Sequence, residues 1–162
     1  MPNLDTHDPH LADILRRASL EREQQDQRLV DIFGTQTVPK VTEEALAIYL
    51  AYLKQHLEFP CQLTGIESRS FFAWEEAHIF GRRRPKEYAQ RKKQQPSYTD
   101  TYTFLSFEEE YDPYAGLAVK VKRESDGKRF VLPLANLKAM EKPSKNHQLL
   151  DDYVVWVVNW RR

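Results

Sequence analysis

The chain has 162 residues, enough for one hydrophobic core, so we expect a single domain with additional terminal helices. Lys and Arg together number 24, as do Asp and Glu, so the zero net charge excludes a whole-molecule attraction for nucleic acid or an anionic membrane. The single cysteine, Cys61, excludes an intramolecular disulfide and a cysteine-based zinc site.

The N-terminal residues have neither the basic stretch nor the apolar stretch of a signal peptide. The longest apolar run, Tyr153–Val158, is much shorter than the roughly 20 residues of a membrane-spanning helix. We therefore expect a soluble, cytoplasmic protein without membrane contact.

Residues 1–40 are predicted to form a polar arm and a polar helix. Apolar residues recur at helical spacing from Leu11, give way to a charged stretch at 21–28, and return before Gly34, which is expected to end the helix. A helix with such a middle lies mostly in water. Packing on a second chain is the alternative role.

The pattern changes to a helix followed by strands after residue 41. Thr42 is a predicted N-cap, and the apolar residues of 46–57 follow at helical spacing until Pro60. Residues 61–66 predict a strand, and the aromatic residues of 71–80 predict a further strand or strand pair. In that aromatic strand, alternation sends Glu75 and Glu76 to opposite faces, and both are expected at the surface, with completion of an ion site by one of them as the alternative.

Residues 82–97 contain seven basic side chains and one acidic side chain, and we interpret them as a solvated inserted loop. Such a loop could bind phosphates or a protein partner, and Tyr88 or Tyr98 could stack on a base. The candidate partner-binding residues are Arg82, Arg83, Arg84, Lys86, Arg91, Lys92 and Lys93.

A hairpin is predicted at residues 117–134. Residues 117–122 alternate between apolar and polar, and Asp126-Gly127 is typical of a two-residue type I′ turn, which would pair Val121 with Leu132. A strand at 101–107 is expected before it, and a helix with a broad apolar face from about Lys145 after it.

Together these elements predict one α+β domain at residues 41–162. Its expected architecture is a small, strongly bent antiparallel sheet or SH3-like barrel, flanked by N-terminal and C-terminal helices.

Four carboxylates stand close together before the hairpin, and Pro113 opens a turn beside them. Ca²⁺ binds about six to eight oxygen ligands, so this segment is a candidate calcium site. The candidate ligands are Glu108, Glu109, Glu110 and Asp112. The alternative is a solvated acidic turn that keeps a sheet edge soluble. No Asp-x-Asp-x-Asp-Gly loop is present, which excludes an EF-hand.

Several stretches resemble the small bacterial calcium-binding proteins of cyanobacterial type: residues 50–61, 74–81, 116–119, 130–137 and 151–159. The resemblance implies a compact β-barrel with packed helices and a Ca²⁺ site of surface carboxylates in the region of Glu108–Asp112. The chain departs from that family in two ways, since those proteins are strongly acidic and lack a basic insertion like 82–95.

A catalytic role is the least favoured interpretation. Cys61 could be approached by His56 and His78, but lone cysteines of this kind are mostly buried core residues. No His pair has metal-ligand spacing and no glycine-rich phosphate loop is present. Asp151 and Asp152 are interpreted as partners of a helix dipole.

The leading hypothesis is therefore a non-catalytic protein that binds calcium weakly. The alternative is an adaptor that docks on a protein or nucleic acid through residues 82–95 and the first helix.

Overall fold

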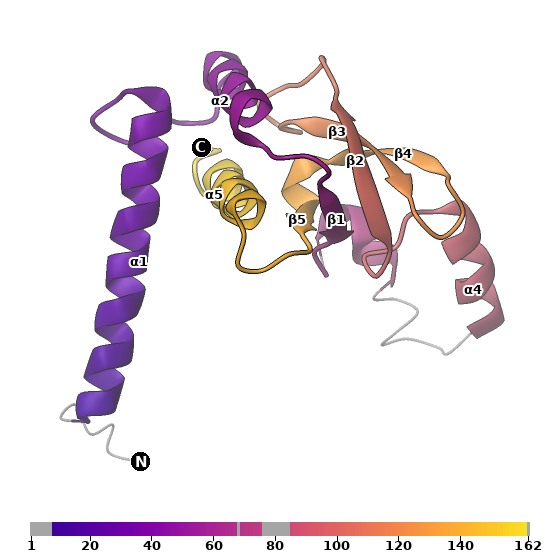
Figure 1. Ribbon diagram of the computed structural model, residues 1–162, viewed down its shortest axis with the longest axis horizontal. Helices are drawn as coiled ribbons and strands as arrows, with labels where there is room; N and C mark the ends of the chain where they lie inside the picture. Colours follow the sequence, from indigo (N-terminus) through magenta and orange to yellow (C-terminus); the bar gives the residue numbers. More distant parts are fainter. Residues whose placement is uncertain (1–7, 68, 76–84, 162) are drawn as a thin grey trace. The chain divides into compact units, whose positions relative to one another are not determined.

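The computed structural model describes residues 8–67, 69–75 and 85–161, and the chain divides into two compact units, Met1–Pro39 and Lys40–Arg162. The first unit contains α1 (Pro9–Phe33), labelled with the other elements in Figure 1. The Asp8 carboxylate accepts a hydrogen bond from the backbone N–H of His10. Gly34 adopts the left-handed conformation, with φ of 64°, and ends α1 as predicted.

The second unit combines helices with one antiparallel sheet in the order β4-β3-β2-β1-β5, which confirms the α+β class. The sheet is not closed in the described part of the chain, because β4 and β5 form its two edges. Its elements are α2 (Glu43–His56), β1 (Gln62–Gly65), the 3-10 helix η1 (Ser70–Phe72), α4 (Pro85–Gln94), β2 (Thr101–Phe107), β3 (Ala118–Arg123), β4 (Arg129–Pro133), the 3-10 helix η2 (Leu134–Asn136), β5 (Leu137–Ala139) and α5 (Lys145–Asn159).

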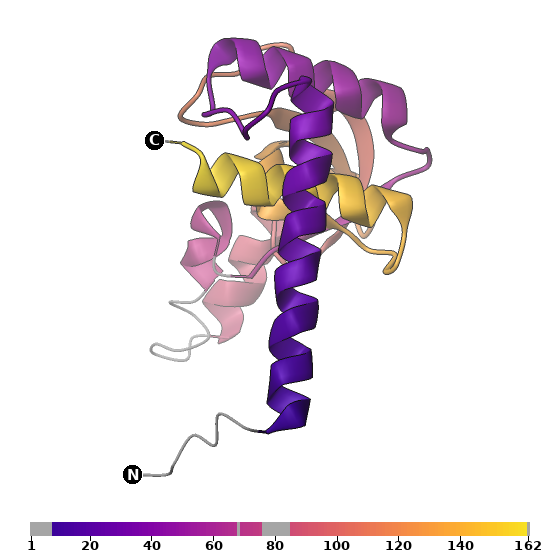
Figure 2. The same cartoon turned by 90° about the vertical axis from the view of Figure 1, so that its left-hand side faces the viewer.

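The hydrophobic core lies between the sheet and the pair α2 and α5. The two helices lie side by side (Figure 2), and the ring of Tyr49 on α2 stacks on that of Trp156 on α5 with centroids 5.1 Å apart. Leu63, Val119 and Leu132 are fully buried, as the alternation of the strands requires. The predicted helices after Thr42 and near Lys145 are confirmed, as are the strands at 61–66 and 101–107.

The hairpin forms, but its register differs from the prediction by two residues. Val121 pairs with Phe130 rather than with Leu132. A shift of two keeps every side chain on its expected face, because the side-chain period of a strand is two.

The predicted two-residue turn is wrong, because the hairpin loop spans residues 124–127 and is closed by a hydrogen bond from the Arg123 N–H to the Lys128 carbonyl. Gly127 takes the left-handed conformation, with φ of 74°. The Asp126 carboxylate accepts the Lys128 N–H at 3.0 Å, which stabilises the longer loop.

Two predictions for the middle of the chain are wrong in the residues that can be compared. Residues 70–75 form η1 and a helical turn instead of a strand, while 76–81 lie outside the described residues. Residues 85–94 form the helix α4 instead of a loop, and Arg82, Arg83 and Arg84 lie outside the described residues. No residue of α4 is buried, so polar contacts and not a core must hold the helix in place.

Candidate functional site

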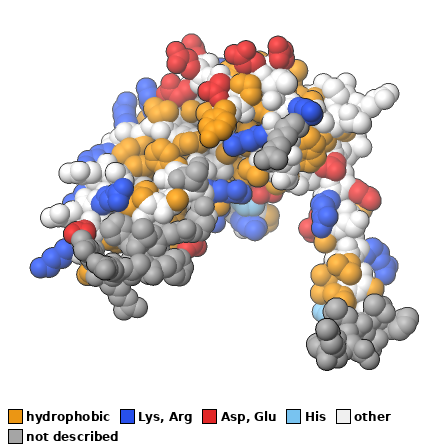
Figure 3. Space-filling model, turned by 180° about the vertical axis from the view of Figure 1, so that it is seen from behind, with side chains coloured by type: hydrophobic (Ala, Val, Ile, Leu, Met, Phe, Trp, Pro, Cys, Tyr) orange, Lys and Arg blue, Asp and Glu red, His pale blue; other side chains and the backbone are white. Residues whose placement is uncertain are grey.

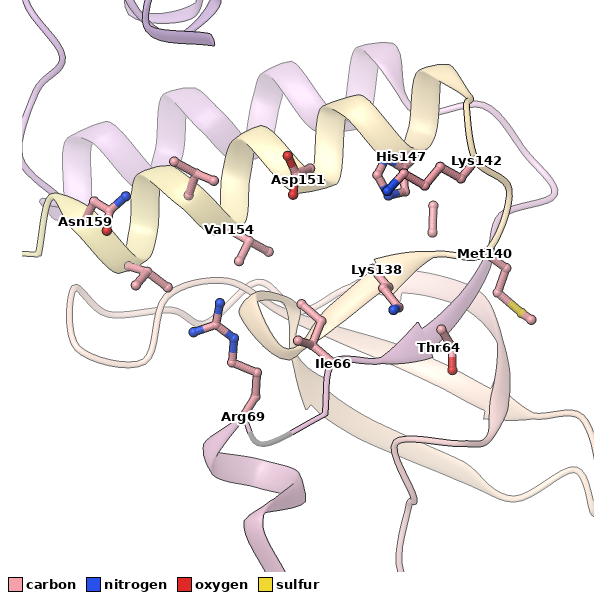
Figure 4. A pocket seen from close by; sticks show the side chains of 13 residues that line it. Thr64, Ile66, Arg69, Lys138, Met140, Lys142, His147, Asp151, Val154 and Asn159 are labelled. Atoms are coloured by element: carbon pink, nitrogen blue, oxygen red, sulfur yellow. The ribbon is translucent and has the colours of Figure 1, made fainter. Parts of the chain in front are cut away.

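A groove of about 570 Å³ lies between α5 and the sheet edge formed by β5 (Figure 4). We call it the α5–β5 groove. Its α5 wall carries His147, Asp151, Val154 and Val158, which recur at helical spacing. The same helix turns its other large apolar residues, including Trp156, into the core. One face of α5 therefore builds the fold, and another builds the groove.

Basic side chains reach the groove from three separate segments. Arg69 precedes η1, Lys138 lies on β5, and Lys142 lies between β5 and α5. Figure 4 shows Arg69 near Val154 and Lys142 beside His147 toward the other end of the groove. The local balance of formal charge is therefore positive, with Asp151 as the carboxylate of the lining.

These charges are not used by the fold in the part of the chain that is described. The side chains of Arg69, Lys138, Lys142 and Asp151 make no ion pair or hydrogen bond with any described residue. Unpaired cations around a cavity attract a negatively charged ligand. A volume of this size is in the range of small-molecule sites, and the valines of α5 add an apolar wall.

The predicted calcium ligands lie in the connection between β2 and β3. Glu108 is half-buried, whereas Glu109, Glu110 and Asp112 are exposed. Among the residues described, no three His, Cys, Asp or Glu side chains form a group that could hold a metal ion. Calcium binding at these positions stays a prediction.

Asp112 has a defined structural contact in this connection. Its Oδ1 accepts hydrogen bonds from the N–H groups of Tyr114 at 2.8 Å and Ala115 at 2.7 Å. Its backbone carbonyl accepts from the Gly116 N–H, also at 2.8 Å. This is an Asx-type turn, so the side chain of Asp112 shapes the entry to β3.

The described basic residues of the predicted partner-binding segment lie on α4. Lys86 and Lys93 are exposed, whereas Lys92 is half-buried and donates to Thr99 Oγ1 at 3.0 Å. The guanidinium of Arg91 lies 4.8 Å from the centre of the Trp74 ring. Lys92 and Arg91 therefore also take part in local packing.

Sequence reasoning missed Arg123, whose side chain is only 3% exposed. It donates to the carbonyls of Lys92 and Gln95 through Nη1 and to that of Lys93 through Nη2, at 2.8–2.9 Å. These are carbonyls at the C-terminal end of α4, which lack partners within the helix. Arg123 therefore joins α4 to the hairpin.

Two carboxylates complete this arrangement, which we call the Arg123 clamp. Asp126 receives hydrogen bonds from Nη2 at 2.7 Å and from Nε at 3.1 Å, and Asp100 receives one from Nη1 at 3.0 Å. The hydrogen bonds with Asp126 and Asp100 raise the pKa of Arg123, and Arg123 in turn lowers the pKa of Asp126 to about 2. A signal for the clamp was present, because the strand alternation turns Arg123 toward the core face.

Glu75 is the second missed residue, and the expectation that it lies at the surface is wrong, since it is 1% exposed. Its carboxylate accepts hydrogen bonds from Tyr88 Oη, Ser97 Oγ and the Tyr98 N–H at 2.7–2.8 Å. Burial and this carboxylate raise the pKa of Tyr88. Glu75 thus joins α4 to the segment that follows it, while Glu76 lies outside the described residues.

Cys61 is buried, and burial raises the pKa of its thiol to about 11. The thiol is therefore protonated, and a poor nucleophile, at neutral pH. His78, one of its candidate partners, lies outside the described residues.

Comparison with known proteins gives no relative: no family model, no curated protein and no solved structure matches the chain. The resemblance to the small bacterial calcium-binding proteins stays a prediction. No helix in the described residues has the length and apolar character needed to cross a membrane.

Proposed function

We propose that this protein is a non-catalytic binding module that takes an anionic ligand into the α5–β5 groove. The observation that carries the proposal is that Arg69, Lys138 and Lys142 line one cavity without a partner among the described residues. Three cations without such partners make the potential of the groove positive. An anion in the groove would therefore bind favourably.

The wall chemistry defines the ligand further. Val154 and Val158 add apolar surface to the lining of the groove, so the ligand combines an apolar body with a phosphate, sulfonate or carboxylate group. Arg69 suits such a group, because a guanidinium can donate two parallel hydrogen bonds to its oxygens. His147 and Lys142 provide a second polar contact at the other end.

This proposal keeps the interaction-module hypothesis and moves its site from residues 82–95 to the groove. Calcium binding, the SH3-like barrel and a cytoplasmic location stay predictions.

Phenyl phosphate is a suitable probe, because it joins an aromatic ring to a dianion, and phenol is its neutral counterpart. An NMR titration of the full chain is expected to shift the amides of residues 66–69, 138–142 and 147–158 with phenyl phosphate and to shift them much less with phenol. Amide shifts confined to another region, or equal responses to both compounds, would contradict the proposal.

The double variant Arg69→Ala/Lys142→Ala is expected to weaken phenyl phosphate binding at least tenfold, because it removes the cations at both ends of the groove. Its free energy of unfolding is expected to stay within about 0.5 kcal/mol of the parent, since neither side chain has a described partner. Lys54→Ala/Lys86→Ala, which removes two exposed lysines elsewhere, is the matched control and should bind normally.

A further inference from the structure

The face of the sheet turned away from the core carries a row of cations. We call it the outer face. Lys120 and Lys122 on β3 and Arg129 on β4 are exposed, and so is Lys138 on the far edge strand β5, where it also lines the α5–β5 groove. Val119 and Val121 on β3 and Leu132 on β4 alternate with the cations of their strands and are buried, so those cations lie on the opposite side of the sheet.

The register brings like charges directly opposite each other. Lys122 pairs with Arg129 across β3 and β4, and on its other side Lys122 pairs with Thr103 of β2. Like charges in directly opposed positions destabilise a sheet. None of the four cations of the outer face makes an ion pair with a described residue. The nearby Glu124 instead accepts hydrogen bonds from Gln62 and Thr103.

The other side chains of the outer face are mostly polar. Thr103 pairs with Gln62, and both donate to the carboxylate of Glu124, while Ser106 and Val131 lie opposite Lys120. Protein–protein interfaces have an apolar centre rich in aromatic residues, which these positions lack. Protein–nucleic acid interfaces are more polar and much more positive, and Lys120, Lys122 and Arg129 outnumber the Glu124 carboxylate here.

We propose that the outer face binds the phosphate backbone of a nucleic acid. The zero net charge of the chain does not oppose this, because it is a sum over the whole surface, and Figure 3 shows acidic side chains gathered along the upper edge of that view. Cations on adjacent strands lie about 4.8 Å apart across the sheet, so one strand of nucleic acid can contact several of them. Backbone contacts of this kind bind without regard to sequence.

The test uses fluorescence anisotropy of labelled 20-nucleotide DNA and RNA, single-stranded and duplex, with the full chain at several salt concentrations. Lys122→Ala/Arg129→Ala is expected to weaken binding at least tenfold and to reduce the slope of log K against log salt by about 1.4 to 1.8, since each phosphate contact contributes about 0.7 to 0.9. Lys120→Gln is expected to reduce the slope by about 0.7 to 0.9.

Two control variants separate this surface from the other basic sites. Lys86→Ala/Lys93→Ala on α4 and Arg69→Ala/Lys142→Ala in the groove are expected to retain nucleic acid binding. Loss of binding in either control with no loss in Lys122→Ala/Arg129→Ala would overturn the assignment. So would absence of binding by the parent chain at low salt. Neither result affects phenyl phosphate binding in the groove, which is measured separately.

Two further measurements complete the test. Polyglutamate is expected to compete poorly with the oligonucleotide for the outer face. Equal competition per charge would overturn the proposal of a nucleic acid ligand and favour an acidic protein as the ligand. Because Lys122→Ala/Arg129→Ala removes an opposed pair of like charges, the variant is expected to unfold at the same or a higher urea concentration than the parent. Unfolding at lower urea would contradict the view that this pair serves binding at the expense of stability.

Discussion

The Arg123 clamp and the α5–β5 groove both bring charged side chains together from separate segments, yet they differ in what surrounds their cations. In the clamp, the guanidinium donates to three carbonyls of residues 92–95 and to two carboxylates. In the groove, the side chains of Arg69 and Lys142 form no ion pair or hydrogen bond with a described residue. The first arrangement is typical of a structural contact and the second of a binding site.

The physical difference lies in solvation. A buried charge is tolerated only when hydrogen bonds replace its water, so every donor of Arg123 must find an acceptor. The groove cations keep access to solvent and need no partner, and they add little to stability. Removing Arg123 should therefore damage the fold, whereas removing the groove cations should damage binding alone.

Arg123→Ala is expected to have the largest effect, a loss of about 3 kcal/mol in the free energy of unfolding. The variant leaves Asp100 without its cation and removes the Arg123 donor from the carbonyls of Lys92 and Gln95. Urea denaturation measures the loss, and hydrogen exchange should show faster exchange in residues 85–97. Arg129→Ala, an exposed arginine across the same hairpin, is the control and should change stability by less than about 0.5 kcal/mol.

If Arg123→Ala lowered the free energy of unfolding no more than Arg129→Ala does, the assignment of Arg123 as a structural contact would be wrong. Faster exchange spread over the whole chain, rather than concentrated at 85–97, would show that Arg123 supports the core and not α4 in particular.

The same clamp predicts a smaller effect of acid. The pKa of Asp126 falls from an ordinary value of 3.8 to about 2 through its hydrogen bonds with Arg123 and Lys128. A depressed carboxyl pKa contributes stability that is present above the unfolded value, and this contribution is lost as the pH falls from about 3.8 to 2. The parent should therefore lose more stability over that interval than Asp126→Asn. Parallel curves for the two proteins would contradict the prediction.

The sequence predicted the elements whose residues repeat with a clear period. The strand at 101–107 and the last helix both have local patterns that tertiary contacts reinforce. Even the wrong hairpin register kept the correct faces, because apolar alternation survives a shift of two residues. The sequence pattern indicates only a turn role for Asp126, whereas its carboxylate also accepts hydrogen bonds from Arg123.

The candidate sites were predicted less well, because they depend on contacts between distant segments. The helix α4 has a polar sequence with little apolar periodicity, and it is held by Glu75 and Arg123, which lie in other elements. Arg69, Lys138 and Lys142 meet only after β1, β5 and α5 have assembled. Acidic and basic runs are visible in a sequence, whereas convergence of single charges is not.

Asp112 gives the smallest effect and extends the comparison to a carboxylate. Because its Oδ1 accepts two backbone N–H groups, Asp112→Ala is expected to lower the melting temperature by about 2–4 °C. Asp112→Asn keeps an oxygen at the same position and should retain the melting temperature of the parent.

If the carboxylate of Asp112 serves only the turn, the melting temperatures of the parent and the variants should not depend on millimolar Ca²⁺ or on a chelator. A Ca²⁺-dependent rise in the parent that Asp112→Asn lacks would instead assign the charge to an ion and restore the calcium site predicted at Glu108–Asp112. The pair of variants thus separates the oxygen, which the turn requires, from the charge, which only a ligand requires.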